Sequence, residues 1–73
     1  MYRVYGKEWC VYCNRAKKLL EDKKFNYEYF DIEKDPEAYK YAMENSNGQK
    51  TVPIIDEGPE LIGGFDQLRI RLK

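Results

Sequence analysis

The segment Cys10-Val11-Tyr12-Cys13 joins a short strand-like run to an amphipathic helical pattern near the start of this chain. Its two cysteines are the only ones among the 73 residues. Thiols three residues apart at a helix start can close into a disulfide with little backbone movement and can reopen by thiolate exchange. The segment therefore predicts a strand–loop–helix unit that carries a redox-active dithiol.

The helix start predicts different roles for the two thiols. Unpaired backbone N–H groups and the positive end of the helix dipole stabilise a thiolate at a helix N-terminus. We therefore expect Cys10, at the cap, to be the nucleophile and Cys13, one turn further in, to be the resolving thiol. Lys7 would add positive charge, whereas the carboxylate of Glu8 would oppose the thiolate if it pointed inward.

Three other interpretations of the cysteines are a structural disulfide, half of a zinc site and two incidental buried thiols. A closed zinc site takes four Cys or His ligands, and this chain has two Cys and no His. The N-terminal residues 1–5 lack the apolar run of a signal peptide. A structural disulfide in a secreted domain usually closes a longer loop, and such domains usually contain more cysteines. These points favour redox chemistry in the cytoplasm, without a metal.

The composition narrows the function classes further. Thirteen basic and thirteen acidic residues cancel, so the chain lacks the basic excess of a nucleic-acid-binding domain. No apolar run approaches the ~18 residues of a membrane span. The absence of histidine removes the usual proton shuttle. We expect a single domain over residues 1–73 that acts as a monomer.

Hydrophobic periodicity and turn residues predict seven elements along the chain. Asp35-Pro36 is a typical helix start, with an N-cap followed by proline at the first helical position. Tyr39, Ala42 and Met43 are expected on the inner face of that helix. The predicted strands are 3–5, ended by Gly6, then 27–32, 52–56 and 61–63, and the predicted helices are 13–24, 36–44 and 65–73.

The order β-α-β-α-β-β-α fixes much of the topology. The first two strands are joined through a helix, so they should be parallel with a right-handed crossover. The last two strands should form an antiparallel hairpin. A four-stranded mixed sheet with helices on both faces, an α/β fold, follows. Reactive sites of such sheets lie at the carboxyl ends of strands, which is where Cys10 stands.

Three motifs in this order resemble those of the glutaredoxins, a family with the thioredoxin fold. They are Cys10-Val11-Tyr12-Cys13, Thr51-Val52-Pro53 and Gly63-Gly64-Phe65-Asp66, and the likeness covers nearly the whole chain. The resemblance implies a thioredoxin-like fold with three helices. It also implies a glutathione-dependent oxidoreductase that reduces protein disulfides and glutathione mixed disulfides, with glutathione as co-substrate and no tightly bound cofactor.

The resemblance further implies a glutathione groove beside the dithiol. In the family, the proline that matches Pro53 is cis and faces the dithiol, so Val52 would present its backbone to an extended peptide. Without the two cysteines, Pro53 would be taken as the first residue of an edge strand. The Gly63-Gly64 turn would receive the γ-glutamyl end of glutathione, with the N–H groups of Phe65 and Asp66 on its α-carboxylate.

Side chains around this groove complete the implied contacts. Lys7 matches the family's lysine before the dithiol and would hold the glycine carboxylate of glutathione. Lys50 stands where the family has a basic residue before the threonine, here Thr51. Tyr12 resembles the tyrosine that lines the groove, and its plainer interpretation is packing against the first helix.

Two positions depart from the family's pattern. Many dithiol glutaredoxins have proline at the position of Val11. Because valine has a backbone N–H and proline has none, this loop contains one more N–H donor. Glutaredoxins often carry an acid at the position of Gln67. Asp66 is therefore the expected replacement for the ammonium contact, and a simple helix cap is its alternative role.

The expected mechanism is thiol–disulfide exchange. Cys10 attacks a disulfide, Cys13 resolves the mixed disulfide, and glutathione regenerates the dithiol. By resemblance, a protein client is ribonucleotide reductase. Two alternatives stay open: a thioredoxin-like donor reduced by a flavoprotein reductase, and a dimer that bridges an iron–sulfur cluster through Cys10 and two glutathiones.

Overall fold

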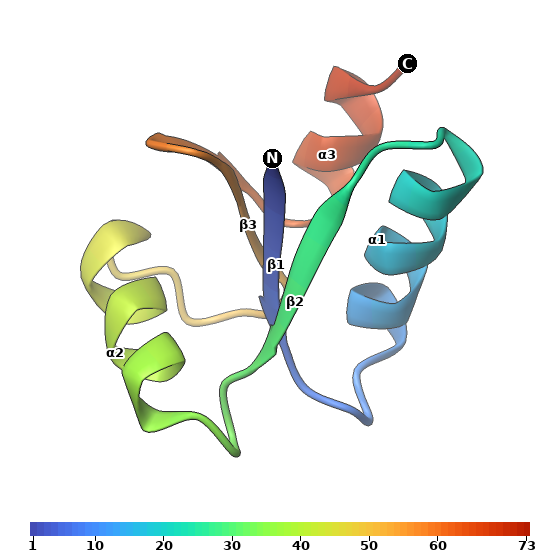
Figure 1. Ribbon diagram of the computed structural model, residues 1–73. Helices are drawn as coiled ribbons and strands as arrows, with labels where there is room; N and C mark the ends of the chain where they lie inside the picture. Colours follow the sequence, from blue (N-terminus) through green and yellow to red (C-terminus); the bar gives the residue numbers. More distant parts are fainter.

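The computed structural model describes residues 1–73, and its elements follow one another in the predicted order (Figure 1). Every predicted boundary lies within two residues of the observed one. The elements are β1 (Tyr2–Gly6), α1 (Val11–Asp22), β2 (Tyr27–Asp31), α2 (Pro36–Asn45), β3 (Ile54–Glu57), β4 (Glu60–Gly63) and α3 (Phe65–Arg71).

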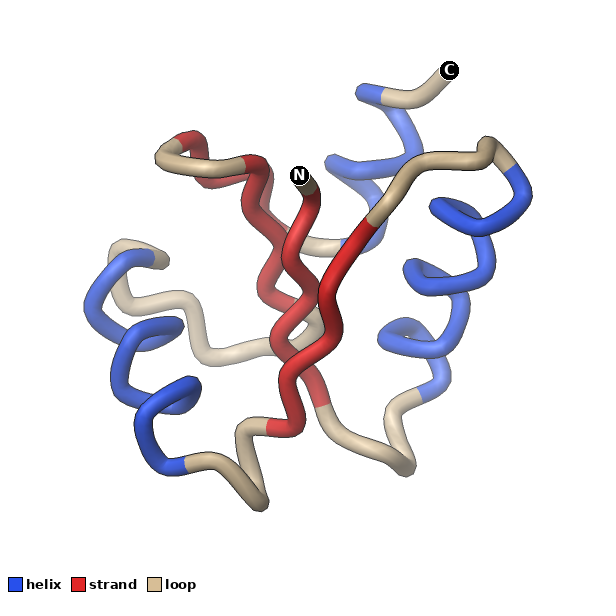
Figure 2. The backbone as a smooth tube through the Cα atoms, in the orientation of Figure 1, coloured by secondary structure: helices blue, strands red, loops and turns tan.

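The sheet has the strand order β2-β1-β3-β4. β1 runs parallel to β2, with Val4 opposite Tyr29, and antiparallel to β3. β3 and β4 form the antiparallel hairpin. The predicted mixed sheet is therefore confirmed. The loops that leave β1 and β2 emerge at the same end of the sheet and lead into α1 and α2 (Figure 2).

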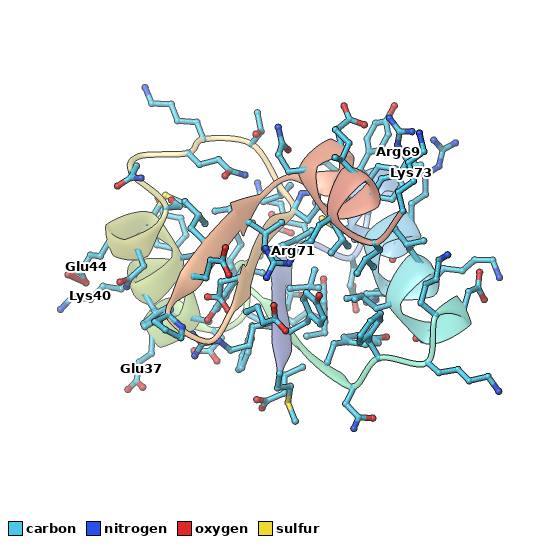
Figure 3. All side chains as sticks on the ribbon, turned by 90° about the horizontal axis from the view of Figure 1, so that it is seen from above. Glu37, Lys40, Glu44, Arg69, Arg71 and Lys73 are labelled. Carbon is cyan, nitrogen blue, oxygen red and sulfur yellow. The ribbon has the colours of Figure 1, made fainter.

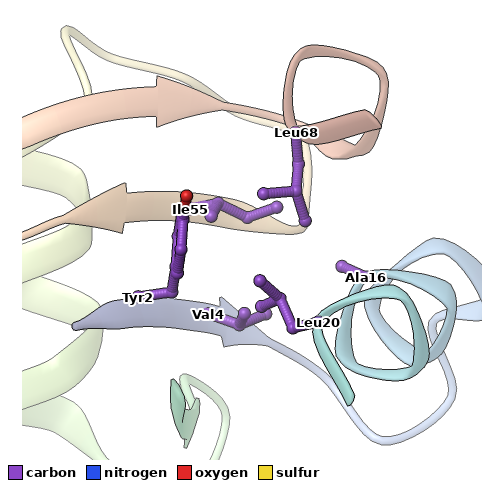
Figure 4. Close-up of a cluster of buried hydrophobic side chains, with 6 residues drawn as sticks. All are labelled: Tyr2, Val4, Ala16, Leu20, Ile55 and Leu68. Carbon is purple, nitrogen blue, oxygen red and sulfur yellow. The ribbon is translucent and has the colours of Figure 1, made fainter. Parts of the chain in front are cut away.

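One face of the sheet is covered by α1 and α3 (Figure 1). Inward residues of β1 and β3 meet the apolar stripes of both helices there. Burial of each large side chain in such a cluster stabilises the fold by about 1.5–3 kcal/mol. The buried members are Tyr2, Val4, Ala16, Leu20, Ile55 and Leu68 (Figure 4).

The opposite face is covered by α2, and its core contains a stack of aromatic rings. Tyr5 stacks on Phe30, with ring centroids 5.1 Å apart, and on Tyr41 at 5.8 Å. The inner side of α2 consists of Ala38 and Ala42, whose small side chains let the helix lie close to these rings.

Tyr39 was expected on this inner face, and that expectation is wrong. Its side chain is 50% exposed. Residues four apart share one side of a helix, so Ala38 and Ala42 lie together on the sheet and turn Tyr39 outward. The predicted start of the third strand at Val52 is also wrong, because β3 begins at Ile54, after Pro53.

Most charged side chains lie on the outside of the molecule, and the exception is Asp56, which is buried and pairs with Arg3 at 2.7 Å. In Figure 3, Glu37, Lys40 and Glu44 of α2 point away from the sheet, whereas Arg71 of α3 lies over the strands. Arg71 joins α3 to the hairpin through Glu57, at 2.6 Å, and Glu60, at 2.9 Å. None of the three helices has the length and apolar character needed to cross a membrane.

Candidate active site

Cys10 is the N-cap of α1. Its backbone is extended, with φ −86° and ψ 115°, so the chain turns into the helix immediately after it. The Cys10 sulfur accepts a hydrogen bond from the Cys13 backbone N–H at 3.1 Å. A sulfur in this position receives an otherwise unpaired helix N–H and the positive end of the helix dipole, both of which favour a thiolate. The predicted placement at the cap is confirmed.

Cys13 lies one turn inside α1, and none of its surface is exposed, whereas Cys10 is 8% exposed. Burial raises the pKa of the Cys13 thiol to about 12, and a hydrogen bond to Cys10 raises this pKa too. Both cysteines are free thiols. The outer sulfur is therefore placed to meet a substrate, and the inner sulfur to follow it.

Gly6, the last residue of β1, makes room for the inner thiol. A Cβ at this position would lie 2.5 Å from the Cys13 sulfur, closer than Cβ atoms come to other heavy atoms in proteins, and 3.0 Å from the Cys13 Cβ. The sequence marked Gly6 only as the end of a strand. Its contact with Cys13 depends on how α1 packs against β1, and no local pattern signals it.

The Val52–Pro53 peptide bond is cis, as the resemblance implied. The Val52 carbonyl oxygen lies 3.9 Å from the Cys10 sulfur. The Gln49 side-chain amide donates hydrogen bonds to the carbonyls on both sides of Val52, to Thr51 at 2.9 Å and to Pro53 at 3.0 Å. Gln49 thus holds the loop that faces the dithiol, and it was not singled out from the sequence.

The Gly63-Gly64 turn lies against the same loop. A Cβ on Gly64 would be 3.9 Å from the Pro53 carbonyl oxygen, and Gly63 has φ +116°, which favours glycine. The Gly64 N–H donates to the Gln67 side-chain oxygen at 2.9 Å. Gln67 therefore closes the start of α3, and Asp66 lies inside the helix instead of capping it.

Aromatic side chains connect the starts of α1 and α3. The rings of Tyr12 and Phe65 have centroids 5.8 Å apart, and Tyr12 is about half exposed. Trp9 is exposed as well, and its indole N–H donates to Glu33 at 3.0 Å. Cys10 is therefore surrounded by an aromatic rim on one side and by the backbone of Val52 on the other.

The charged residues predicted for the groove are less closely assembled. The Lys7 ammonium lies 5.1 Å from the centre of the Trp9 ring, and its carbonyl accepts the Cys10 N–H at 3.2 Å. Lys50 and Thr51 are exposed on the loop before Val52. Asp66 is exposed and lies 3.9 Å from Arg69.

Glu8, the acid next to the dithiol, does not point toward it. Its carboxylate pairs with the Lys34 ammonium at 3.1 Å, on the exposed side of the loop. No group of three or more His, Cys, Asp or Glu side chains is arranged to hold a metal ion. Together, the arrangement offers one slightly exposed sulfur, one fully buried sulfur and a bare backbone edge, which suits exchange of a disulfide with an extended peptide.

Comparisons with known proteins agree with this arrangement. A family model described as Glutaredoxin matches residues 3–62. A glutaredoxin of Ricinus communis is 37% identical over 65 residues, which cover 86% of this chain and 64% of that protein. A glutaredoxin of Enterobacteria phage T4 is 36% identical over 83 aligned positions, which cover 94% of this chain and 95% of that protein.

Solved structures show the same likeness. A buckwheat glutaredoxin–glutathione complex superposes with a TM-score of 0.82 at 30% identity, covering 96% of this chain and 66% of that one. This chain thus spans less than two thirds of the Ricinus and buckwheat proteins and nearly all of the phage protein.

Proposed function

The chain belongs to the glutaredoxin family, and we propose that it is a thiol–disulfide oxidoreductase that uses glutathione. It reduces protein disulfides and glutathione mixed disulfides through Cys10 and Cys13. The observation that carries this proposal is the unequal placement of the two sulfurs. The Cys10 sulfur caps α1 and accepts the Cys13 N–H at 3.1 Å, while Cys13 is fully buried behind it.

The reaction follows from that placement. The Cys10 thiolate attacks one sulfur of the substrate disulfide, a bond forms between them, and the other substrate sulfur leaves as a thiol after taking a proton. Cys13 then attacks the Cys10 sulfur, which releases the second substrate thiol and leaves a Cys10–Cys13 disulfide. Two glutathione molecules return this disulfide to the dithiol and become glutathione disulfide.

Glutathione binds along the groove between Val52 and the start of α3. The backbone of Val52 pairs with the peptide part, with Thr51 and Pro53 on either side of it. This assignment is supported by the 3.9 Å separation between the Val52 carbonyl and the Cys10 sulfur. It is also supported by the relative's structure, which is that of a glutaredoxin–glutathione complex.

The two carboxylate ends of glutathione take different partners. The N–H groups of Phe65 and Asp66, next to Gly64, receive the γ-glutamyl α-carboxylate. Lys7 and Lys50 attract the glycine carboxylate, and Tyr12 lines the groove between the ends. The Gln67 oxygen already accepts the Gly64 N–H, which leaves the Asp66 carboxylate for the ammonium group.

Protein disulfides are the larger substrates, and ribonucleotide reductase is the client to test first. The exposed rim formed by Trp9, Val11 and Tyr12 gives such a client apolar area beside Cys10. The protein acts as a monomer in the cytoplasm, where glutathione keeps thiols reduced.

The test is glutathione-coupled reduction of a small glutathione mixed disulfide by wild type, Cys10→Ser and Cys13→Ser. Wild type should turn over, Cys10→Ser should be inactive, and Cys13→Ser should retain part of the activity, because Cys10 alone can exchange with a glutathionylated substrate. Far-ultraviolet circular dichroism checks that both variants are folded.

Other outcomes would contradict the proposal in different ways. Turnover with a flavoprotein reductase but none with glutathione would make the chain a thioredoxin-like donor. Equal activity in Cys10→Ser and wild type would remove Cys10 from the chemistry altogether.

A further inference from the structure

A buried hydroxyl on the sheet face covered by α1 has no part in the mechanism above. The Tyr29 side-chain oxygen is buried and makes no hydrogen bond. An unpartnered buried hydroxyl costs folding free energy, so natural proteins rarely keep one without a reason. The reason can be sought among the groups that surround this ring.

The ring of Tyr29 borders the resolving cysteine. From β2 it faces α1, and one edge carbon lies 3.4 Å from the position that a Cβ on Gly6 would take. The Cys13 sulfur lies 2.5 Å from that same position. The Cys13 sulfur and the edge of the Tyr29 ring therefore both line the space left open by Gly6.

A cation lies over the same ring. Lys17 follows Cys13 by one helical turn on α1, so the two side chains share a side of the helix. The Lys17 ammonium is 4.1 Å from the centre of the Tyr29 ring, within the range of a cation–π contact. The charge is thereby held over the sheet beside Cys13 instead of extending into solvent.

We propose that the Tyr29 hydroxyl and the Lys17 ammonium together stabilise the Cys13 thiolate as it forms in the resolving step. The inference rests on the proposed function. In that step the Cys13 thiol loses its proton, its sulfur bonds to the Cys10 sulfur, and the bond between Cys10 and the substrate sulfur breaks. The substrate sulfur leaves with the electron pair and takes up a proton, so one thiol replaces another.

The resolving step needs such help because Cys13 is poorly ionised. Burial raises its pKa to about 12, whereas the charge of Lys17 lowers that pKa. The chain has no histidine to take the proton. Burial also raises the pKa of Tyr29 to about 12, so its hydroxyl stays protonated and remains a donor. Tyr29 and Lys17 keep their protons throughout and act as supporting residues.

The test is a single-turnover stopped-flow reaction of the full chain with a glutathionylated peptide. Trp9 is the only tryptophan and precedes Cys10, so its fluorescence follows the reaction. The peptide thiol and glutathione are released one in each step, so measuring both thiols times the two steps. We expect Tyr29→Phe and Lys17→Met each to slow the second phase by about tenfold, the value of a hydrogen bond or charge at a developing thiolate. The first phase, in which only Cys10 reacts, should keep its rate.

Matched controls separate this role from a structural one. Tyr27→Phe removes a hydroxyl that pairs with Glu21, and Lys18→Met removes an exposed ammonium that pairs with Asp22, so both should react like wild type. In a Cys13→Ser background, Tyr29→Phe and Lys17→Met should have no effect on the Cys10 step. Tyr29→Phe keeps the ring and loses only an unpartnered hydroxyl, so it should fold.

Three outcomes would overturn the inference. A wild-type rate for the second phase in both variants removes the pair from the step. Equal slowing of both phases points to a structural role. A wild type that never exchanges with the glutathionylated peptide overturns the proposed function and this inference with it, whereas normal exchange with an unchanged second phase leaves the proposed function intact.

Discussion

The starts of α1 and α2 lie at the same end of the sheet and are built alike, but they use different atoms as caps. In α1 the Cys10 sulfur accepts the N–H of Cys13 at 3.1 Å. In α2 the Asp35 carboxylate accepts the N–H of Ala38, also at 3.1 Å. In each case the acceptor precedes the donor by three residues, which is the usual N-cap arrangement.

The difference lies in what the cap can do besides capping. A carboxylate is a good acceptor and poor nucleophile, so the α2 start serves the stability of the fold. A thiolate is a weaker acceptor and a strong nucleophile, so the same backbone donors can favour a reactive group at the α1 start. The residue that donates its N–H to the cap also differs between the two helices. Cys13 carries the second sulfur, whereas Ala38 packs against the sheet.

Replacing the α1 cap should have the largest effect on activity. Cys10→Ser keeps a good capping atom, so the free energy of unfolding should change by less than about 1 kcal/mol. Exchange of a glutathione mixed disulfide should fall by more than about a hundredfold, because the nucleophile is gone. Urea unfolding and the coupled assay measure the two quantities on one preparation. A variant that loses stability and activity together would break the comparison.

Filling the space behind the α1 start should have the next largest effect. Gly6→Ala places a Cβ against the Cys13 sulfur and should destabilise the fold by about 1–3 kcal/mol. The cost should shrink when Cys13→Ala is also present, because the clashing sulfur is then absent. Chemical denaturation of the four proteins of this cycle measures the coupling. An equal cost in both backgrounds would mean that the two residues do not interact.

Removing the α2 cap should affect stability alone. Asp35→Ala leaves the N–H groups of Glu37 and Ala38 without an acceptor, and the expected loss is about 1 kcal/mol. The rate of exchange at Cys10 should stay at the wild-type value. Asp35→Ser is the matched control, since serine restores a capping oxygen. A change in the exchange rate of Asp35→Ala would show that the two starts are not independent.

Alkaline pH should have the smallest effect, a loss of folding stability that comes from the start of α1 through Cys13. Burial raises the pKa of Cys13 from its ordinary value of 9.0 to about 12. Between these values the unfolded chain releases a proton that the folded chain keeps, so stability should fall as pH rises through this range. The range from pH 9 to 10 is suitable for the measurement because tyrosines such as Tyr29, with an ordinary pKa of 10.0, ionise mainly above it. In this range the free energy of unfolding of Cys13→Ser should fall less than that of wild type. Equal losses would contradict this account.

Local sequence patterns predicted the element order because each signal lies within one segment. The Asp35-Pro36 cap, the apolar spacing of α1 and the turn residues near Gly58 need no knowledge of the rest of the chain. The inner face of α2 was predicted less well, because Tyr39 was expected there with Ala42 and Met43 and is exposed. Only the packing of Ala38 and Ala42 on the sheet decides which side of α2 faces inward.

The site was less predictable because its parts come from distant segments. The roles of Gly6 beside Cys13 and of Gln49 beside Val52 depend on contacts across the fold. The role of Gln67 had a local signal, because a glutamine three residues after a helix cap often closes the first turn. Its amide was compared with the family's acid, and this structural use was missed.

The Gln49 amide has a consequence for what the loop can recognise. It occupies the carbonyls of Thr51 and Pro53, so the loop offers a partner the N–H and C=O of one residue, Val52. A partner that binds through the main-chain groups of one residue is selected by the shape and direction of its own backbone, and its amino-acid sequence matters little. Such a loop would let one small protein serve many unrelated clients, each admitted by an accessible disulfide and an extended backbone around it.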